Sequence, residues 1–294
     1  MLSQNNSSAA VPATPVYGST AAPEASSAGV QPASVTFSDV NRHYGALHAL
    51  GPIDLQLRAN EFFAVVGPSG CGKSTMLDVL AGLNKPTSGQ ITFEGQAIDG
   101  NVPDGVGVVF QEDATFPWLT VESNIGFGLR RRGVAKDEIA RRVDRALKFM
   151  GLGAFAKAYP SQLSGGMRQR VCIARTLVME PRLILLDEPF GALDQQTRLL
   201  MGDELLRLWR ETGATVVLIT HSIDEAAMLA DRVGVMSSRP GRFIEVIETG
   251  WPRDRDSRIA GQADFGLVTT RIWHLLREES IKAMAAHTEK ALRT

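Results

Sequence analysis

The chain has 294 residues, of which 44% are hydrophobic and 21% are charged, a composition that suits one large or two small globular domains. Its 31 basic and 32 acidic residues leave a formal net charge of −1, which argues against a nucleic-acid partner bound through a general basic field. Two widely spaced cysteines, Cys71 and Cys172, make no disulfide framework, and no apolar run is long enough to predict a membrane span.

The N-terminal segment, residues 1–33, is rich in Ala, Ser, Pro and Thr and holds a single charged residue, Glu24. Such a segment buries too little apolar surface to offset the entropy lost on ordering, so we expect a disordered tail. It has neither the basic start nor the apolar block of a secretory signal. Globular patterning begins near Val35, where Val35 and Phe37 alternate with polar neighbours as in a strand.

Three short apolar runs follow, at residues 62–66, 183–186 and 215–220, and each ends in a turn or in polar residues. Continuous apolar runs of this length are typical of parallel strands that are covered on both faces. In open α/β sheets, ligands bind at the edge formed by the carboxyl ends of such strands. The sequence therefore predicts an α/β fold with a ligand site at that edge.

Two stretches have the apolar spacing of amphipathic helices. Residues 136–150 predict a helix whose charged face is solvated surface, and the second stretch predicts a C-terminal helix that docks on the chain's own domain. The first apolar stripe is Ile139, Val143, Ala146, Leu147 and Met150, and the second is Val268, Ile272, Leu275 and Leu276.

The first apolar run, residues 62–66, leads into a glycine-rich segment, residues 67–75. This segment matches the P-loop pattern G-x-x-x-x-G-K-[ST]. Glycines let backbone N–H groups curl around phosphate oxygens, and the following helix presents its positive end to the same anion. Lys73 is expected to reach the β- and γ-phosphates and Ser74 to bind Mg²⁺. The alternative is a turn that binds nothing. The predicted nucleotide contacts are Gly67, Pro68, Ser69, Gly70, Cys71, Gly72, Lys73, Ser74 and Thr75.

Two adjacent carboxylates, Asp187 and Glu188, follow the second apolar run, residues 183–186. Asp187 is placed to organise Mg²⁺, and Glu188 is placed to orient or deprotonate an attacking water. Two acidic residues after a strand can also be a simple cap. The preceding P-loop favours the catalytic interpretation.

A second candidate anion site lies at residues 163–170, Leu-Ser-Gly-Gly-Met-Arg-Gln-Arg, where Ser164, Gly165 and Gly166 open a predicted helix. This segment resembles the L-S-G-G-x-x-Q-R signature of the ABC ATPase family. In that family the signature faces the nucleotide held by the P-loop of the other protomer. The resemblance therefore implies a head-to-tail dimer of two copies that buries two ATP molecules.

The remaining motifs of that family occur in the same order along about residues 34–250. The resemblance implies that Gln111 senses Mg²⁺ and γ-phosphate, that Asp194 lies in the loop crossing the dimer interface, and that His221 contacts the γ-phosphate. It also implies that Tyr44 stacks on adenine, and the alternative is that Tyr44 serves packing alone.

The implied fold is a P-loop NTPase with a RecA-like core, an antiparallel β-subdomain and an inserted helical subdomain at about residues 112–170 that carries the signature. Residues 251–294 are then a short helical extension. Segments 114–121, 187–194 and 237–242 are more closely similar to importers of nitrate, sulfonate and taurine.

That similarity implies an ATPase that uses Mg²⁺ and lies peripherally at the cytoplasmic face of the cell membrane beneath transmembrane permease subunits. A periplasmic or lipid-anchored solute-binding protein would take part indirectly. The alternatives are a soluble ABC ATPase, as in translation or DNA repair, and another P-loop enzyme such as a kinase. The single cassette without a coiled-coil insertion argues against the former, and the signature at Ser164 argues against the latter.

Two further hypotheses concern single segments. Residues 116–119, Phe-Pro-Trp-Leu, are expected to form the socket for the membrane partner, unless Phe116 and Trp118 are core of the helical subdomain. Cys71 is either a reactive thiol that bound ATP protects or an inert filler within the P-loop.

Overall fold

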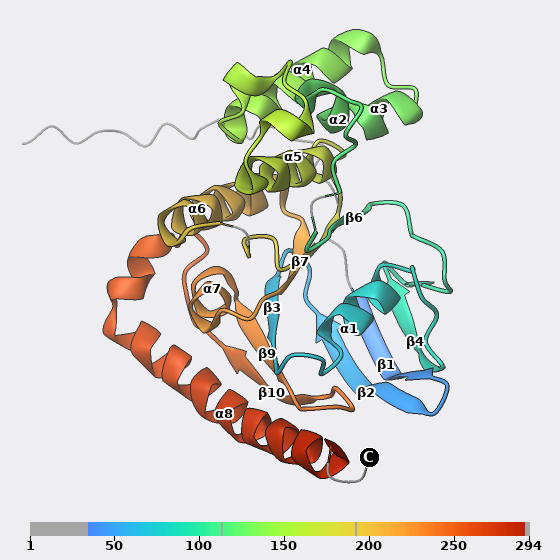
Figure 1. Ribbon diagram of the computed structural model, residues 1–294, viewed down its shortest axis with the longest axis vertical. Coiled ribbons are helices and arrows are strands. Elements are labelled where there is room, and N and C mark those ends of the chain that lie inside the picture. The colour runs from blue at the N-terminus through green and yellow to red at the C-terminus, as the bar shows by residue number, and fades with distance from the viewer. Residues whose placement is uncertain (1–34, 113, 192, 292–294) are drawn as a thin grey trace, which may run out of the picture.

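The computed structural model describes residues 35–291 apart from 113 and 192, with side chains described as far as residue 283. The predicted tail, residues 1–33, lies outside these described residues. In Figure 1, helices α2 to α5 gather at the top, the strands lie below them, and α8 runs along the lower left edge. Two separate sheets form the framework, one largely parallel and one antiparallel, as the sequence predicted.

The larger sheet has the strand order β10-β9-β3-β8-β7-β6, in which only β10 is antiparallel to its neighbour. The three predicted apolar runs are its central strands, and every residue in them is buried. Its strands are β3 (Phe62–Val66), β6 (Val106–Val109), β7 (Leu183–Asp187), β8 (Thr215–Ile219), β9 (Arg232–Met236) and β10 (Phe243–Glu248).

Alternate residues of these strands enter two different cores because successive side chains of a strand point to opposite faces. In β3, Phe62, Ala64 and Val66 belong to one core, and Phe63 and Val65 belong to the other. Each face of the sheet therefore needs its own cover. This explains why the runs are continuously apolar rather than alternating.

The smaller, antiparallel sheet has the order β2-β1-β4-β5, and it shares the second core with α1. Helix α1 starts at the end of β3 and packs against β2 and β7. The bounds are β1 (Val35–Tyr44), β2 (Leu47–Leu57), β4 (Ser88–Phe93), β5 (Gln96–Ala97) and α1 (Lys73–Leu80).

A group of helices between β6 and β7 packs over the first core. The predicted amphipathic helix is α4, and its residues Val143 and Leu147 are buried as expected, as is Met150 just after its end. Helix α5 packs against α2, α4 and β6 and returns the chain to β7. The bounds are α2 (Val121–Ile125), α3 (Phe127–Arg131), α4 (Lys136–Phe149), two short 3-10 turns (Gly153–Phe155 and Pro160–Gln162) and α5 (Gly165–Leu177).

The C-terminal stripe packs on the chain's own domain, as predicted. Ile272 is fully buried, and Val268, Leu275 and Leu276 pack against the first core. This helix, α8, lies against α7 and β9. The remaining elements are α6 (Gln195–Thr212), α7 (Ile223–Leu229), a 3-10 turn (Ser257–Gly261) and α8 (Ala263–Ala291).

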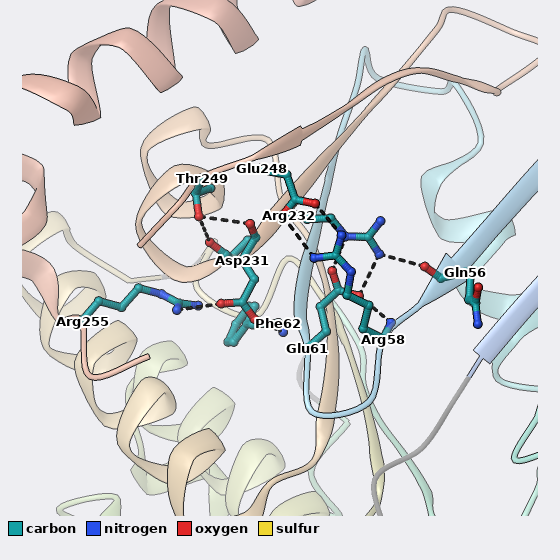
Figure 2. Close-up of polar contacts among 10 residues, drawn as sticks. Gln56, Arg58, Glu61, Phe62, Asp231, Arg232, Glu248, Thr249 and Arg255 are labelled. Atoms are coloured by element: carbon teal, nitrogen blue, oxygen red, sulfur yellow. Dashed lines mark hydrogen bonds and ion pairs between the residues drawn. The ribbon is translucent and has the colours of Figure 1, made fainter. Parts of the chain in front are cut away.

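A set of polar contacts fastens the start of β3 to the start of β9 (Figure 2). Arg232 donates to Glu61 at 2.8 Å, and both side chains are largely shielded from solvent. Asp231 accepts the backbone N–H of Phe62 at 2.9 Å and pairs with Arg255 at 2.8 Å. Charged hydrogen bonds of this kind fix geometry more firmly than neutral ones. They hold the N-terminal end of β3, the strand that carries the P-loop at its C-terminal end.

Candidate nucleotide-binding site

The P-loop joins the carboxyl end of β3 to α1, as the sequence predicted. Gly72 precedes the helix with a φ of 118°, a left-handed conformation that favours glycine. A Cβ at this position would lie 2.7 Å from the carbonyl oxygen of Ala49. Glycine is therefore required here both by backbone conformation and by the close approach of β2.

Lys73 lies at the start of α1 and is only 8% exposed. Its Nζ donates to the carbonyl oxygens of Gly67 at 2.9 Å and Pro68 at 3.1 Å. The ammonium group thus lies inside the P-loop, where it is predicted to contact phosphate.

Ser74 hydrogen-bonds to Asp187, which links the first turn of α1 to the tip of β7. Burial raises the pKa of Asp187, and the neighbouring Glu188 raises it further, although the hydrogen bond from Ser74 opposes this. Among residues 35–291 as described, no group of three or more His, Cys, Asp and Glu side chains forms a metal cage. A hydroxyl and one carboxylate instead fit Mg²⁺, which keeps several waters and takes phosphate oxygens as further ligands.

Three side chains meet at one carboxylate oxygen. Gln111 Nε2 donates to Glu188 Oε2 at 2.9 Å, and His221 Nδ1 lies 3.2 Å from the same oxygen. Gln111, Glu188 and His221 follow the neighbouring strands β6, β7 and β8. Because parallel strands end at the same edge, residues far apart in the sequence come together there.

Glu188 has a φ of 46°, which is unusual for a residue other than glycine. Its backbone N–H donates to the carbonyl oxygen of Ile219 at 2.9 Å, so β8 holds the residue in this conformation. Strained backbone of this kind is concentrated at functional sites. Here it turns the Glu188 side chain toward Gln111 and His221.

Sequence reasoning missed the support behind His221. Glu225 is buried, and its Oε2 accepts the Thr220 hydroxyl at 2.6 Å, while Oε1 lies 3.3 Å from Arg198. Burial raises the pKa of Glu225, against the hydrogen bond from Thr220. The signal was present as Ser222 followed by Glu225, a capping-box spacing, and Ser222 does accept the Glu225 N–H at 3.2 Å.

The structure places two further predicted residues at the surface. Tyr44 is 42% exposed, and the Arg42 guanidinium lies 4.5 Å from its ring centroid. Asp194 caps α6 by accepting the Thr197 N–H at 3.0 Å and its hydroxyl at 2.6 Å. These hydrogen bonds from Thr197 lower the pKa of Asp194.

Ser164 caps α5 by accepting the N–H of Met167 at 3.3 Å. Gly166 lies close to the loop before α6, since a Cβ there would lie 2.5 Å from Leu193. Helix α5 belongs to the upper group of helices, and α1 lies lower down and packs against β2 (Figure 1). The two candidate anion sites therefore belong to different parts of the chain.

The structure favours one of the two interpretations of Cys71. Cys71 is 2% exposed, and burial raises the pKa of its thiol, against the lowering influence of Lys73. Desolvation is the larger influence, because it disfavours the charged thiolate more than the positive charge of Lys73 favours it. Cys71 therefore fits the other interpretation, an inert residue that fills space beneath the P-loop.

We expect thiol reagents to label Cys71 slowly in the native chain near neutral pH. The folded-state pKa is raised, so the neutral thiol should persist there and labelling should increase only as the pH becomes more alkaline. Mass spectrometry of native and unfolded chain measures this, and Cys172→Ala assigns the site. Rapid labelling at neutral pH that bound ATP prevents would restore the reactive interpretation.

Comparison with known proteins gives the same family as the sequence motifs. A family model described as "ABC transporter" matches residues 50–191. The nitrate import ATP-binding protein NrtD of Synechocystis is 41% identical, over 82% of this chain and 94% of the relative. The taurine import ATP-binding protein TauB of Pelagibacter ubique is 48% identical, over 67% of this chain and 74% of the relative.

Solved structures agree with the sequence relatives. A dimeric ATP-binding cassette in a post-hydrolysis state with ADP and Pi has a TM-score of 0.67 and 32% identity, covering 74% of this chain and 100% of that one. Over the part of this chain that the structure describes, every helix is too short or too polar to cross a bilayer. On the family model and the relatives together, the chain belongs to the ABC transporter ATP-binding proteins.

Proposed function

We propose that this ABC ATPase powers the import of a small solute, either an oxyanion or an organosulfonate. The observation that supports ATP hydrolysis most directly is the meeting of Gln111, Glu188 and His221 at one carboxylate oxygen. The solute class rests on the likeness to TauB and NrtD, whose names state taurine and nitrate import.

In the proposed reaction, the P-loop amides and Lys73 hold the β- and γ-phosphates. Mg²⁺, held by Ser74 and Asp187 with Gln111, would neutralise charge that develops on the phosphates. Glu188 orients a water and accepts its proton as the water oxygen attacks the γ-phosphorus. His221 contacts the γ-phosphate from the next strand, and ADP leaves as the bond to the β-phosphate breaks.

A second copy of the chain is the partner that completes each site. The signature at Ser164, Gly165 and Gly166 offers an anion-binding helix end that the chain's own P-loop does not use. Head-to-tail pairing brings it to the nucleotide of the other copy, with Asp194 in the loop between them. The likeness to a dimeric cassette supports this arrangement. Tyr44, exposed at the end of β1, is the proposed stacking surface for adenine.

The membrane partner is proposed to dock on residues 116–119. Trp118 is 71% exposed, so it is not core of the isolated chain. Phe116 lies 4.6 Å from Phe127 and 5.8 Å from Trp118 between ring centroids, and the Arg175 guanidinium lies 4.8 Å from its ring. An exposed aromatic residue that packs against other aromatic side chains is a common anchor for a helix from another protein.

Replacing Trp118 by Ala should leave the isolated chain folded and able to bind ATP, because little of the side chain is buried. It should weaken assembly with the permease subunits by about 2 kcal/mol and uncouple hydrolysis from transport. Co-purification, ATPase rate and solute uptake measure this. Trp273→Ala is the matched control, since Trp273 is also an exposed tryptophan, on α8. Normal assembly and transport by the Trp118 variant would reject the socket.

The proposed location is the cytoplasmic face of the cell membrane, where permease subunits hold the chain, with a solute-binding protein acting on the far side. Affinity purification in mild detergent, followed by identification of co-purifying proteins, tests this directly. A solute-binding protein recovered in this way is then screened against nitrate, sulfonates and taurine. A chain that never sediments with membranes would favour the soluble ABC ATPase instead.

A further inference from the structure

The loop between β9 and β10, residues 237–242, was singled out in the sequence but has no part in the proposed reaction. In the structure it lies against the P-loop. Arg239 donates to the carbonyl oxygen of Gly70 twice, from Nη2 at 2.7 Å and from Nε at 3.1 Å. A forked guanidinium that uses two donors on one acceptor fixes both position and direction.

The Gly70 carbonyl matters because the amide groups of the P-loop must point inward to bind phosphate. The carbonyl groups then point away and need other partners. Lys73 now occupies the carbonyl oxygens of Gly67 and Pro68, but its ammonium is the group expected to contact phosphate. Arg239 comes from a separate segment, so it can hold Gly70 while Lys73 turns to the nucleotide.

The same loop is itself firmly seated. Gly241 donates to the carbonyl oxygen of Ala49 at 3.2 Å and accepts the N–H of Gly51 at 2.8 Å. A Cβ on Gly241 would lie 2.2 Å from the carbonyl oxygen of Cys71, so the two backbones touch. Arg239 therefore projects from a platform whose distance from the P-loop is fixed by backbone contact.

Helix α8 holds the residue just before Arg239. Glu279 is 4% exposed, and its Oε2 accepts the Ser238 N–H at 2.8 Å and the Ser238 hydroxyl at 3.1 Å. Lys282 donates to the other oxygen of Glu279 at 2.5 Å. Glu279 thus holds Ser238, and the next residue along the chain, Arg239, holds Gly70.

We propose that Arg239 is a positioning residue for phosphate binding, and that Glu279 makes the C-terminal helix part of the support of the P-loop. The proposal rests on the nucleotide-binding function proposed for this loop. Neither side chain is assigned a contact with ATP. Arg239 keeps the Gly70 peptide oriented for the phosphates, and Glu279 keeps Arg239 in reach of it.

The test compares ATP affinity and steady-state kinetics of full-length variants. Arg239→Ala should raise the Kd and KM for ATP about tenfold while leaving kcat nearly unchanged, because the lost hydrogen bonds support binding and not the chemical step. Arg239→Lys, which keeps the charge but has a single donor nitrogen, should recover part of the affinity. A purely structural role for Arg239 would lower the melting temperature without this split between KM and kcat.

Glu279→Gln should raise the Kd about threefold, and the double variant with Arg239→Ala should bind no more weakly than Arg239→Ala alone. Arg271→Gln is the matched control, because Arg271 joins α8 to Glu245 of β10 without touching Ser238 or Gly70. Arg271→Gln should leave the Kd for ATP unchanged, both alone and when it is combined with Arg239→Ala. If Glu279→Gln proves unstable, Ser238→Ala removes one of the two contacts and serves instead.

Two results would overturn the proposal: an unchanged ATP affinity in Arg239→Ala, or independent, multiplying effects of Arg239→Ala and Glu279→Gln. Failure of the wild-type chain to bind MgATP would contradict the function proposed for the site, and with it this inference. The two failures are distinguishable because the first requires a wild-type chain that binds normally.

Discussion

Glu188→Gln is expected to lower the rate of ATP hydrolysis by at least about a hundredfold while ATP binding persists. The amide has the shape of the carboxylate and can still contact Gln111 and His221, but it cannot accept a proton from water. Nucleotide then stays bound between the two copies, so the ATP-bound dimer should accumulate. Phosphate release measures the first effect, and size-exclusion chromatography with ATP measures the second.

The matched control is Glu248→Gln, which neutralises a surface carboxylate paired with Arg58, away from the carboxyl edge of the sheet. It should hydrolyse ATP at the wild-type rate and show no unusual dimer. Wild-type hydrolysis by Glu188→Gln would remove Glu188 from its assigned role. The geometry at Oε2 would then need another explanation.

Ser164→Arg is expected to abolish ATP-driven dimer formation, because it puts bulk and length at the helix end where phosphate of the other copy must dock. In the Glu188→Gln background, the ATP-bound dimer should no longer accumulate. ATP binding to the single chain should be retained, since the P-loop is unaltered. Ser88→Arg, at an exposed serine of β4, is the control and should still form the dimer.

A mixing experiment tests whether each site uses both copies. Lys73→Ala and Ser164→Arg should each be inactive alone. In the mixed dimer, one site carries both changes and the other carries neither, so partial hydrolysis should return. An ATP-bound dimer that persists in Ser164→Arg, Glu188→Gln would show that the signature is not at the interface.

Local sequence patterns predicted the elements well where one signal dominates. The fully buried strands β3, β7 and β8 were visible as continuous apolar runs, and α4 as a periodic stripe, because burial on given faces leaves a direct mark on composition. The P-loop was visible because its backbone shape demands glycine at set positions. Ser222 and Glu225 carried a local signal of the same kind, a capping-box spacing, although the prediction missed it.

The burial of a single side chain was harder to predict from the sequence. Cys71 lies in a loop next to a helix end, which favours a thiolate when only neighbouring residues are considered. In the folded chain Cys71 is buried, and the loss of solvent raises the pKa of its thiol. For Trp118 the sequence favoured an exposed socket but left core packing open, and the fold leaves the side chain exposed. Burial depends on which distant segments pack over a position.

The sequence by itself determined the phosphate loop, the buried strands that lead to it and the family to which the chain belongs, since each depends on residues that are close together. Only the tertiary structure decided that Gln111 and Glu188, 77 residues apart, share a hydrogen bond, and that Arg239 supports Gly70 across 169 residues. Contacts of that span follow from strand order and from the packing of α8, which no local pattern encodes.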